Sequence, residues 1–171
     1  MFVIALAIPF SALWIYLSKT HKNPRTPYKF TFGLLFIGIG FLLLAISGQF
    51  ADSAGKVPFI FLVGGYLMFV IGELNMSPVG LSKITELSPQ KLVGFMMGIW
   101  FLASASAFNL GGFIGRKMAI TAKTDGADIS GFDSLGVYTS GFQNIAYVAF
   151  GAALFALLFA PIMKKWMDDI H

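Results

Sequence analysis

The amino-acid sequence predicts an all-α integral membrane protein with about five transmembrane helices. Hydrophobic residues make up 57% of the 171 positions, charged residues make up only 12%, and the mean hydropathy is +0.78. A soluble domain needs about twice that charged fraction to keep its surface solvated. The apolar residues form long runs without the strict alternation of a membrane β-barrel strand. Lipid rather than water is therefore expected to face much of this chain.

Five apolar runs are candidates for these helices. A bilayer core about 30 Å thick is crossed by roughly 20 residues of α-helix. Four of the runs reach that length, and the first is slightly short. The predicted spans cover residues 1–17, 28–50, 57–85, 91–118 and 141–163, with a loop over residues 119–140.

Lys and Arg residues predict the orientation, because the cytoplasmic loops of membrane proteins carry an excess of both. Eight of them fall in connections on one side, namely Lys19, Lys22, Arg25, Lys29, Lys83, Lys91, Lys164 and Lys165. Four fall on the other side, namely Lys56, Arg116, Lys117 and Lys123. We therefore expect a multi-pass protein of the inner (plasma) membrane with a cytoplasmic C-terminus. Met1 then lies outside, and a short span that starts so abruptly there indicates a chain cut at its upstream end.

Composition argues against several classes of function. The chain has no Cys and only two His, His21 and His171, both in charged stretches. We therefore expect no metal and no organic cofactor, because no ligand cluster or phosphate-binding loop is visible. No nucleophile–base pair stands out, which argues against an enzyme. The net charge of +4 is interpreted as cytoplasmic loop charge rather than as a nucleic-acid-binding surface.

Glu73 is the most informative residue, because it lies near the middle of the third apolar run. A carboxylate at bilayer depth costs roughly 2.5–3.5 kcal/mol on insertion scales, so such a residue should face the bundle interior or a water-filled cavity. One interpretation is a proton site or a ligand for a cationic group. The alternative is a neutral carboxyl held by an interhelical hydrogen bond.

Ser77, Pro78 and Gly80 follow Glu73 on the same predicted helix. Pro78 has no amide proton, so it frees the carbonyl of Leu74 and is expected to kink the helix. Ser77 is four residues after Glu73 and Gly80 lies on nearly the same face, so an acid, a hydroxyl and a freed carbonyl converge on one stripe. This pattern is typical of a polar site for an ammonium group. The alternative for Ser77 is a hydroxyl bonded back to its own helix.

Other apolar segments carry no chemistry. Leu34–Ser47 is apolar all round, so we expect it to lie against lipid or at the bundle periphery. Gly94 and Gly98, and then Gly111 and Gly115, have the small-xxx-small spacing that lets helices approach closely. Ordinary helix packing is expected for these glycines, with a gating hinge as the alternative.

Several stretches resemble the proton-dependent oligopeptide transporter family of major-facilitator proteins. The most specific are Glu73–Ser82 (ELNMSPVGLS), Glu86–Pro89 (ELSP) and Gly94–Phe101 (GFMMGIWF), which look like the family's tenth and eleventh helices. Upstream, Ile8–Trp14 (IPFSALW), the Asn23-Pro24 turn, and Lys29-Phe30 before Gly33 look like its eighth helix and the start of its ninth.

The resemblance implies roles for individual residues. Glu73 matches the acid that contacts the amino terminus of the peptide in the central cavity, and Ser77 matches a neighbouring cavity position. Trp100 matches a tryptophan that shapes a side-chain pocket, although ordinary bundle packing is its alternative. Ser104, one turn on, and Asn109 are further candidates for substrate binding, and Pro78 and Gly80 are candidates for a kink or hinge.

The resemblance also implies what this chain lacks. The family's first helix carries a Glu-x-x-Glu-Arg motif, and no such motif occurs here. The chain therefore resembles the C-terminal part of a twelve-helix fold, contributing residues 1–171 to its second six-helix bundle and half of the cavity. The implied function is proton-coupled symport of di- and tripeptides, with the missing N-terminal helices as partner. The alternatives are a major-facilitator transporter of another small solute and a stand-alone membrane scaffold that uses Glu73 and Pro78 for docking.

Overall fold

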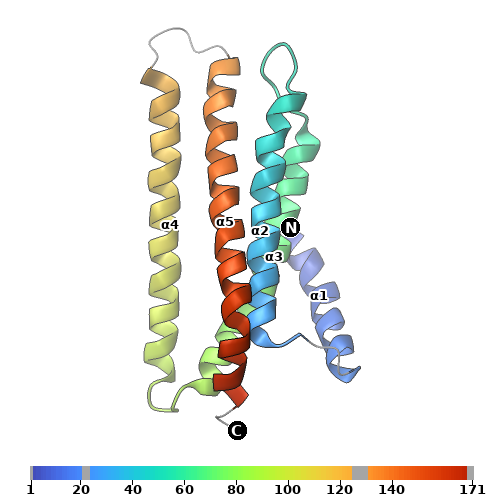
Figure 1. The fold of residues 1–171 in the computed structure, drawn as a ribbon, viewed down its shortest axis with the longest axis vertical. Coiled ribbons are helices and arrows are strands. Elements are labelled where there is room, and N and C mark those ends of the chain that lie inside the picture. Colours follow the sequence, from blue (N-terminus) through green and yellow to red (C-terminus); the bar gives the residue numbers. More distant parts are fainter. Residues whose placement is uncertain (1, 21–23, 125–130, 169–171) are drawn as a thin grey trace.

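The computed structural model describes residues 2–20, 24–124 and 131–168, and every regular element in these ranges is a helix (Figure 1). The α-helices are α1 (Phe2–Lys19), α2 (Thr26–Ile46), α3 (Phe59–Leu87), α4 (Val93–Thr124) and α5 (Gly131–Asp168). A 3-10 helix, η1 (Ser47–Phe50), continues α2. The expected all-α membrane fold class is therefore confirmed.

In the part of the chain that the structure describes, four helical segments are long and apolar enough to cross a membrane: Thr26–Phe50, Phe59–Leu87, Val93–Ala119 and Leu135–Ile162. The first apolar helix, Val3–Lys19, is shorter, in keeping with the short first span expected from the sequence. Figure 1 shows the connection α2–α3, the end of α4 and the start of α5 at one end of the bundle, and the connection α3–α4 with the end of α5 at the other.

The long loop expected over residues 119–140 is mostly helical. Helix α4 continues to Thr124 and α5 begins at Gly131, so both helices reach beyond their apolar windows. The physical reason is that a helix need not end where its hydropathy falls, since Arg, Lys, Met and Ala are all good helix formers. Residues 125–130, between the two helices, lie outside the described residues.

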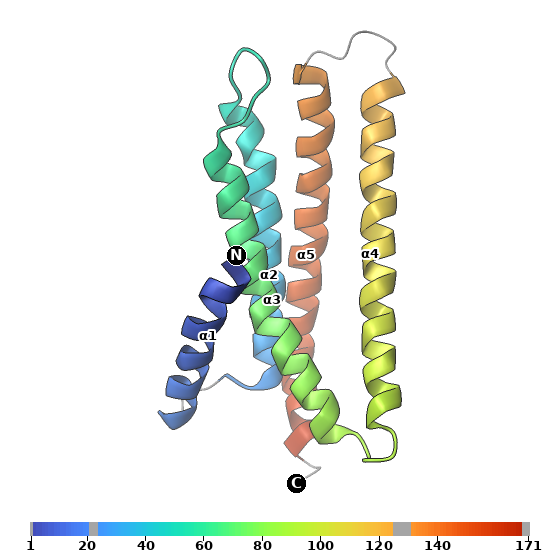
Figure 2. The ribbon, with the colours of Figure 1, turned by 180° about the vertical axis from the view of Figure 1, so that it is seen from behind.

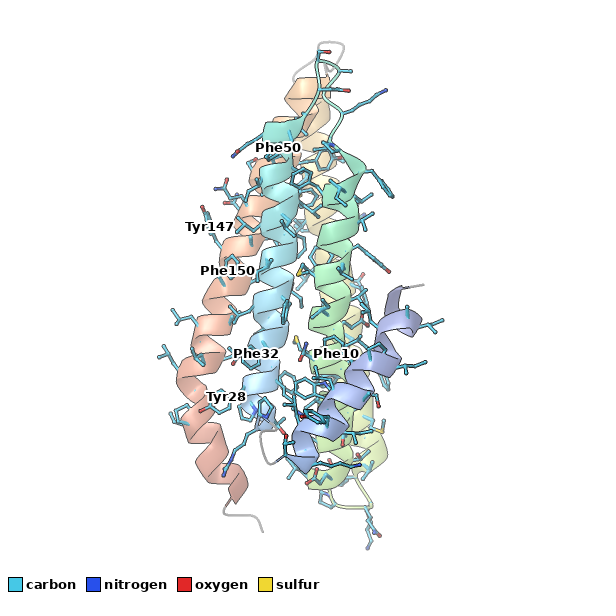
Figure 3. All side chains as sticks on the ribbon, turned by 90° about the vertical axis from the view of Figure 1, so that its right-hand side faces the viewer. Phe10, Tyr28, Phe32, Phe50, Tyr147 and Phe150 are labelled. Atoms are coloured by element: carbon cyan, nitrogen blue, oxygen red, sulfur yellow. The ribbon has the colours of Figure 1, made fainter. Side chains whose placement is uncertain are left out.

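Helix α2 makes the most extensive contacts among the described helices. It packs against α5 on one side and α3 on the other, while the expected lipid contact of Leu34–Ser47 stays a prediction. The ring of Phe41 lies 4.7 Å from that of Phe69 on α3 and 6.1 Å from that of Phe142 on α5. The ring of Phe150 covers Gly38, and Figure 3 shows Phe150 on α5 beside α2.

Paired glycines bring the backbones of α2 and α3 together. A Cβ atom added at Gly72 would lie 2.8 Å from the carbonyl oxygen of Gly33, and one added at Gly33 would lie 3.0 Å from the carbonyl oxygen of Gly72. The pair Gly40 and Gly65 repeats this arrangement, at 3.0 and 3.3 Å. Small residues at such positions replace side-chain contacts with close backbone contacts, the usual way that membrane helices pack tightly.

The turn between η1 and α3 is organised by Asp52. Its carboxylate accepts hydrogen bonds from the backbone N–H groups of Ala54 at 2.9 Å and Lys56 at 2.8 Å. These two donors hold the pKa of the Asp52 carboxyl below its usual range. Gly55 has a φ of 73°, a left-handed conformation that glycine adopts without steric cost. The turn thus fixes the connection between η1 and α3.

Helix α4 is the least covered element. Both ribbon views show it beside α5 and away from α2 (Figures 1 and 2). A Cβ atom added at Gly94, Gly98, Gly111 or Gly115 would meet nothing within 4 Å. The expected packing role of these four glycines is therefore not seen among the described residues, where the close glycine contacts are made by glycines of α2, η1, α3 and α5.

Candidate functional site

Glu73 lies on an open face of α3. The residue is exposed, and within the described ranges no side chain or backbone group forms a hydrogen bond or an ion pair with its carboxylate. The interhelical hydrogen bond considered as its alternative role is thus not found in this part of the chain. An uncompensated carboxylate in the middle of an apolar helix is available to a ligand that carries a positive charge.

Ser77 and Pro78 extend the site by one helical turn. The Ser77 side chain is half-buried, and no hydrogen bond back to its own helix is formed, in contrast to the four hydroxyls of Thr31, Thr85, Ser104 and Ser106. Pro78 lies inside α3 and cannot donate to the Leu74 carbonyl. Beyond it, the C-terminal part of α3 leans away from α2 towards the start of α4 (Figure 2).

The indole ring of Trp100 packs against Gly80. A Cβ atom at position 80 would lie 2.8 Å from Cζ2 and 3.0 Å from Cζ3 of that ring, with Cη2 closer still. Gly80 is buried, and it shares the helix face of Glu73 and Ser77 by its spacing. The structure therefore brings Trp100 of α4 to the lower end of the Glu73 stripe. We define the Glu73 face as Glu73, Ser77, Gly80 and Trp100.

Ser104 and Asn109 continue along α4 from Trp100. The Ser104 hydroxyl donates to the Trp100 carbonyl at 3.1 Å, which keeps it on the same side of the helix. The Asn109 amide donates to the Ala105 carbonyl at 3.0 Å and is exposed. Asn109 follows Trp100 by nine positions, which is about two and a half turns, so it lies on the opposite side of α4. Its place in a substrate site stays a prediction.

A second feature lies on the α1 side of α3. A pocket of about 460 Å³, here called the basic pocket, is lined by Trp14, Pro24, Arg25, Thr26, Lys29, Pro78, Val79, Ser82 and Lys83. A neighbouring pocket of about 380 Å³, here called the apolar groove, is lined by Ala7, Phe10, Ser11, Trp14, Ile15, Ser18, Leu74, Pro78 and Val79. Glu73 lines neither of them.

From the sequence, Lys29 was interpreted only as one of the cytoplasmic positive charges and as part of the Lys29-Phe30 stretch that resembles the family. A further role for Lys29 was indicated by its position in the first turn of an apolar helix, two residues after Pro27. In the structure, Lys29 is only 9% exposed, and its Nζ lies 4.1 Å from the centre of the Trp14 ring. A buried cation on an aromatic face is a local contact between helices that hydropathy cannot reveal.

Comparison with known proteins identifies the family of this chain. A sequence profile described as PTR2, POT family, matches residues 1–129. The chain belongs to the POT family. It is 38% identical over 158 residues to dipeptide and tripeptide permease B of Aliivibrio fischeri, covering 92% of this chain and 31% of the relative. It is 39% identical over 164 residues to dipeptide and tripeptide permease A of Proteus mirabilis, covering 96% and 32%.

Solved POT structures share the fold. A mutant of the peptide transporter POT in complex with alafosfalin matches 96% of this chain and 30% of that chain, with 31% identity and a TM-score of 0.70. A structure described as giving insights into substrate recognition in proton-dependent oligopeptide transporters matches 91% and 32%, with 29% identity and a TM-score of 0.64. This POT-family chain thus spans about a third of the relatives and structures that it matches. Its relatives are named as permeases, so the family to which it belongs is one of transporters.

Proposed function

We propose that this chain is the C-terminal part of a proton-coupled symporter for di- and tripeptides and that it contributes half of the central peptide-binding cavity. The observation that carries the proposal is the carboxylate of Glu73, exposed without a partner among the described residues in the apolar middle of α3. At neutral pH, a peptide has a positively charged amino terminus, which such a carboxylate attracts. The permease names of the POT relatives support a peptide cargo over another small solute or a scaffold role.

In this mechanism, the Glu73 face binds one end of the substrate. Glu73 pairs with the peptide amino group, Ser77 offers a hydroxyl beside it, and Trp100 forms an aromatic wall for varied side chains. Ser104 and Asn109 are the further substrate-binding candidates on α4. The missing N-terminal helices supply positive charge for the peptide carboxylate, so the substrate bridges the two halves and favours their closure. Pro78 interrupts the hydrogen-bond ladder of α3 and lets its lower part bend during this step.

Proton entry supplies the energy of transport. Each proton that moves down the membrane potential contributes about 2.3 kcal/mol per 100 mV. The proposed topology places the ends that carry Lys29 and Lys83 in the cytoplasm, because most Lys and Arg residues flank the spans on that side. The C-terminus then lies in the cytoplasm of a multi-pass inner-membrane protein.

Uptake of a labelled dipeptide into liposomes tests the proposal. The transporter that contains this chain together with its N-terminal helices is expected to accumulate the dipeptide when a proton gradient is imposed, and to stop when the gradient is collapsed. Liposomes with the 171-residue chain alone are expected to accumulate none, because half of the cavity is absent. Proton-driven uptake by the chain alone would contradict the assignment of half a cavity, and a lack of uptake by the whole transporter would contradict the peptide symporter.

A further inference from the structure

The basic pocket gathers positive charge where α1, α2 and α3 meet. Arg25, Lys29 and Lys83 all line it, and no Asp or Glu is among its lining residues. Lys83 is paired with Glu86 at 2.6 Å, and both of these side chains are partly exposed. Lys29 is the most deeply placed of the three cations, and no described residue accepts a hydrogen bond from it or forms an ion pair with it. Burial of a cation without an anion is costly, so the pocket favours an anionic ligand.

A second donor in the same pocket lacks an acceptor. The indole Nε1 of Trp14 is buried, and it has no hydrogen-bond partner among the described residues. Buried donors are nearly always paired in proteins, so an unpaired one indicates a missing acceptor. The pocket also lies at the start of α2, where Arg25 is the N-cap residue. The first backbone N–H groups of a helix favour negative charge.

The apolar groove continues directly from the basic pocket. The two share Trp14, Pro78 and Val79. Further along, the groove is lined by Ala7, Phe10, Ile15 and Leu74, and it runs between α1 and α3. Figure 3 shows α1 beside the lower half of α3, with Phe10 at this junction. A free inorganic anion would occupy only the basic pocket, whereas an amphiphile would fill both the basic pocket and the apolar groove.

The depth of the pocket fits a lipid headgroup. Lys29 lies in the first turn of α2, at the end of the membrane-spanning segment Thr26–Phe50. The headgroups of a bilayer lie at the ends of such spans, and basic pockets between helices on the cytoplasmic side suit anionic headgroups.

We propose that the basic pocket and the apolar groove together bind one anionic phospholipid. Its phosphate accepts hydrogen bonds from Lys29 and the Trp14 indole and lies near the positive charge of Arg25, and one acyl chain lies between α1 and α3. A phosphate offers several acceptor oxygens, and a hydrogen bond to it from a charged donor is stronger than one between neutral groups. The site is separate from the Glu73 face and rests on the proposed topology only for the leaflet that supplies the lipid.

Native mass spectrometry of the purified chain in detergent tests this site. Phosphatidylglycerol, phosphatidylcholine and inorganic phosphate are added in separate arms. We expect retention of phosphatidylglycerol and little retention of phosphatidylcholine, and an excess of inorganic phosphate should not displace the bound lipid. Retention of both lipids alike would contradict headgroup selection. Displacement by inorganic phosphate would identify a free-phosphate site and overturn the lipid proposal.

Variants assign the binding to named residues. Lys29→Gln is expected to lower the retained fraction about fivefold, and Lys29→Arg to preserve it, since one basic residue near an anionic lipid is worth roughly that factor. Lys83→Gln, at a more exposed position, is a second variant that should also weaken retention. Lys56→Gln, in the turn at the opposite end of the bundle, is the matched control and should retain lipid like the unaltered chain. Unchanged retention in Lys29→Gln and Lys83→Gln would overturn the site, and the result does not depend on peptide transport.

Discussion

Replacement of Glu73 by Gln is expected to lower dipeptide affinity about a hundredfold or more and to abolish uptake by the transporter that contains this chain. The substitution keeps the size of the side chain and removes its charge. A peptide ammonium that is held in a cavity without its carboxylate loses roughly 3–5 kcal/mol, which corresponds to this change in affinity. Binding is measured by calorimetry and uptake by a labelled dipeptide in liposomes.

Glu86→Gln is the matched control on the same helix. Its carboxylate pairs with Lys83 at 2.6 Å in a partly exposed ion pair, and such pairs contribute about 0–1 kcal/mol. Dipeptide affinity should therefore change by less than about fivefold. If Glu73→Gln left affinity and uptake like those of Glu86→Gln, Glu73 would have no role in binding the amino end.

Replacement of Gly72 by Val is expected to destabilise the packing of α2 against α3 by about 1–3 kcal/mol. A Cβ atom at this position meets the Gly33 carbonyl oxygen and the Ile37 Cγ1 atom, each at 2.8 Å. The carbonyl oxygen belongs to the backbone, so the two helices must separate to relieve the contact. The measurement is the unfolding of the reconstituted chain by sodium dodecyl sulfate, followed by circular dichroism.

Gly94→Ala provides the comparison on α4. Nothing lies within 4 Å of a Cβ atom at Gly94, so no described contact opposes the added methyl group. Alanine favours the helix over glycine by about 1 kcal/mol, and the unfolding midpoint should rise slightly or stay constant. Equal midpoints for Gly72→Val and the unaltered chain would show that the glycine contact does not stabilise this helix pair.

The sequence predicted helices well because hydropathy reports which segments avoid water. Four of the five apolar runs appear as segments able to span a membrane, and the first appears as a shorter helix, as its length indicated. The ends of α4 and α5 were missed, because a helix continues wherever its residues favour one, with or without lipid around it. The resemblance to the POT family, based on Glu73–Phe101, is confirmed by the profile match and by the permease relatives.

Packing between helices was harder to predict from the sequence. Leu34–Ser47 is apolar all round, a pattern equally typical of a lipid-facing helix and of a central one, so the pattern did not predict the contacts of α2 with α3 and α5. Glycine spacing was similarly ambiguous. Gly33 and Gly72 lie in close contact, whereas Gly94 and Gly98 are open. Which small residues meet depends on how the helices are placed, which spacing within one helix does not encode.

In the candidate site, too, features of a single helix were predictable and contacts between helices were not. Glu73 could be singled out from the sequence because an acid at bilayer depth is costly wherever the other helices lie. The contact between Trp100 and Gly80 joins α4 to α3, so it could not be predicted from the sequence of either helix alone. The pairing of Lys29 with Trp14 likewise joins α2 to α1.

Competition for uptake shows which end of the substrate Glu73 binds. Labelled dipeptide uptake by the transporter that contains this chain is measured against an unlabelled dipeptide, its N-acetylated form, and nitrate. We expect the free dipeptide to compete strongly and the N-acetylated form and nitrate to compete weakly, because neither carries the ammonium group that Glu73 binds. Equal competition by the free and N-acetylated dipeptides would contradict the assignment of Glu73 to the amino end of the peptide.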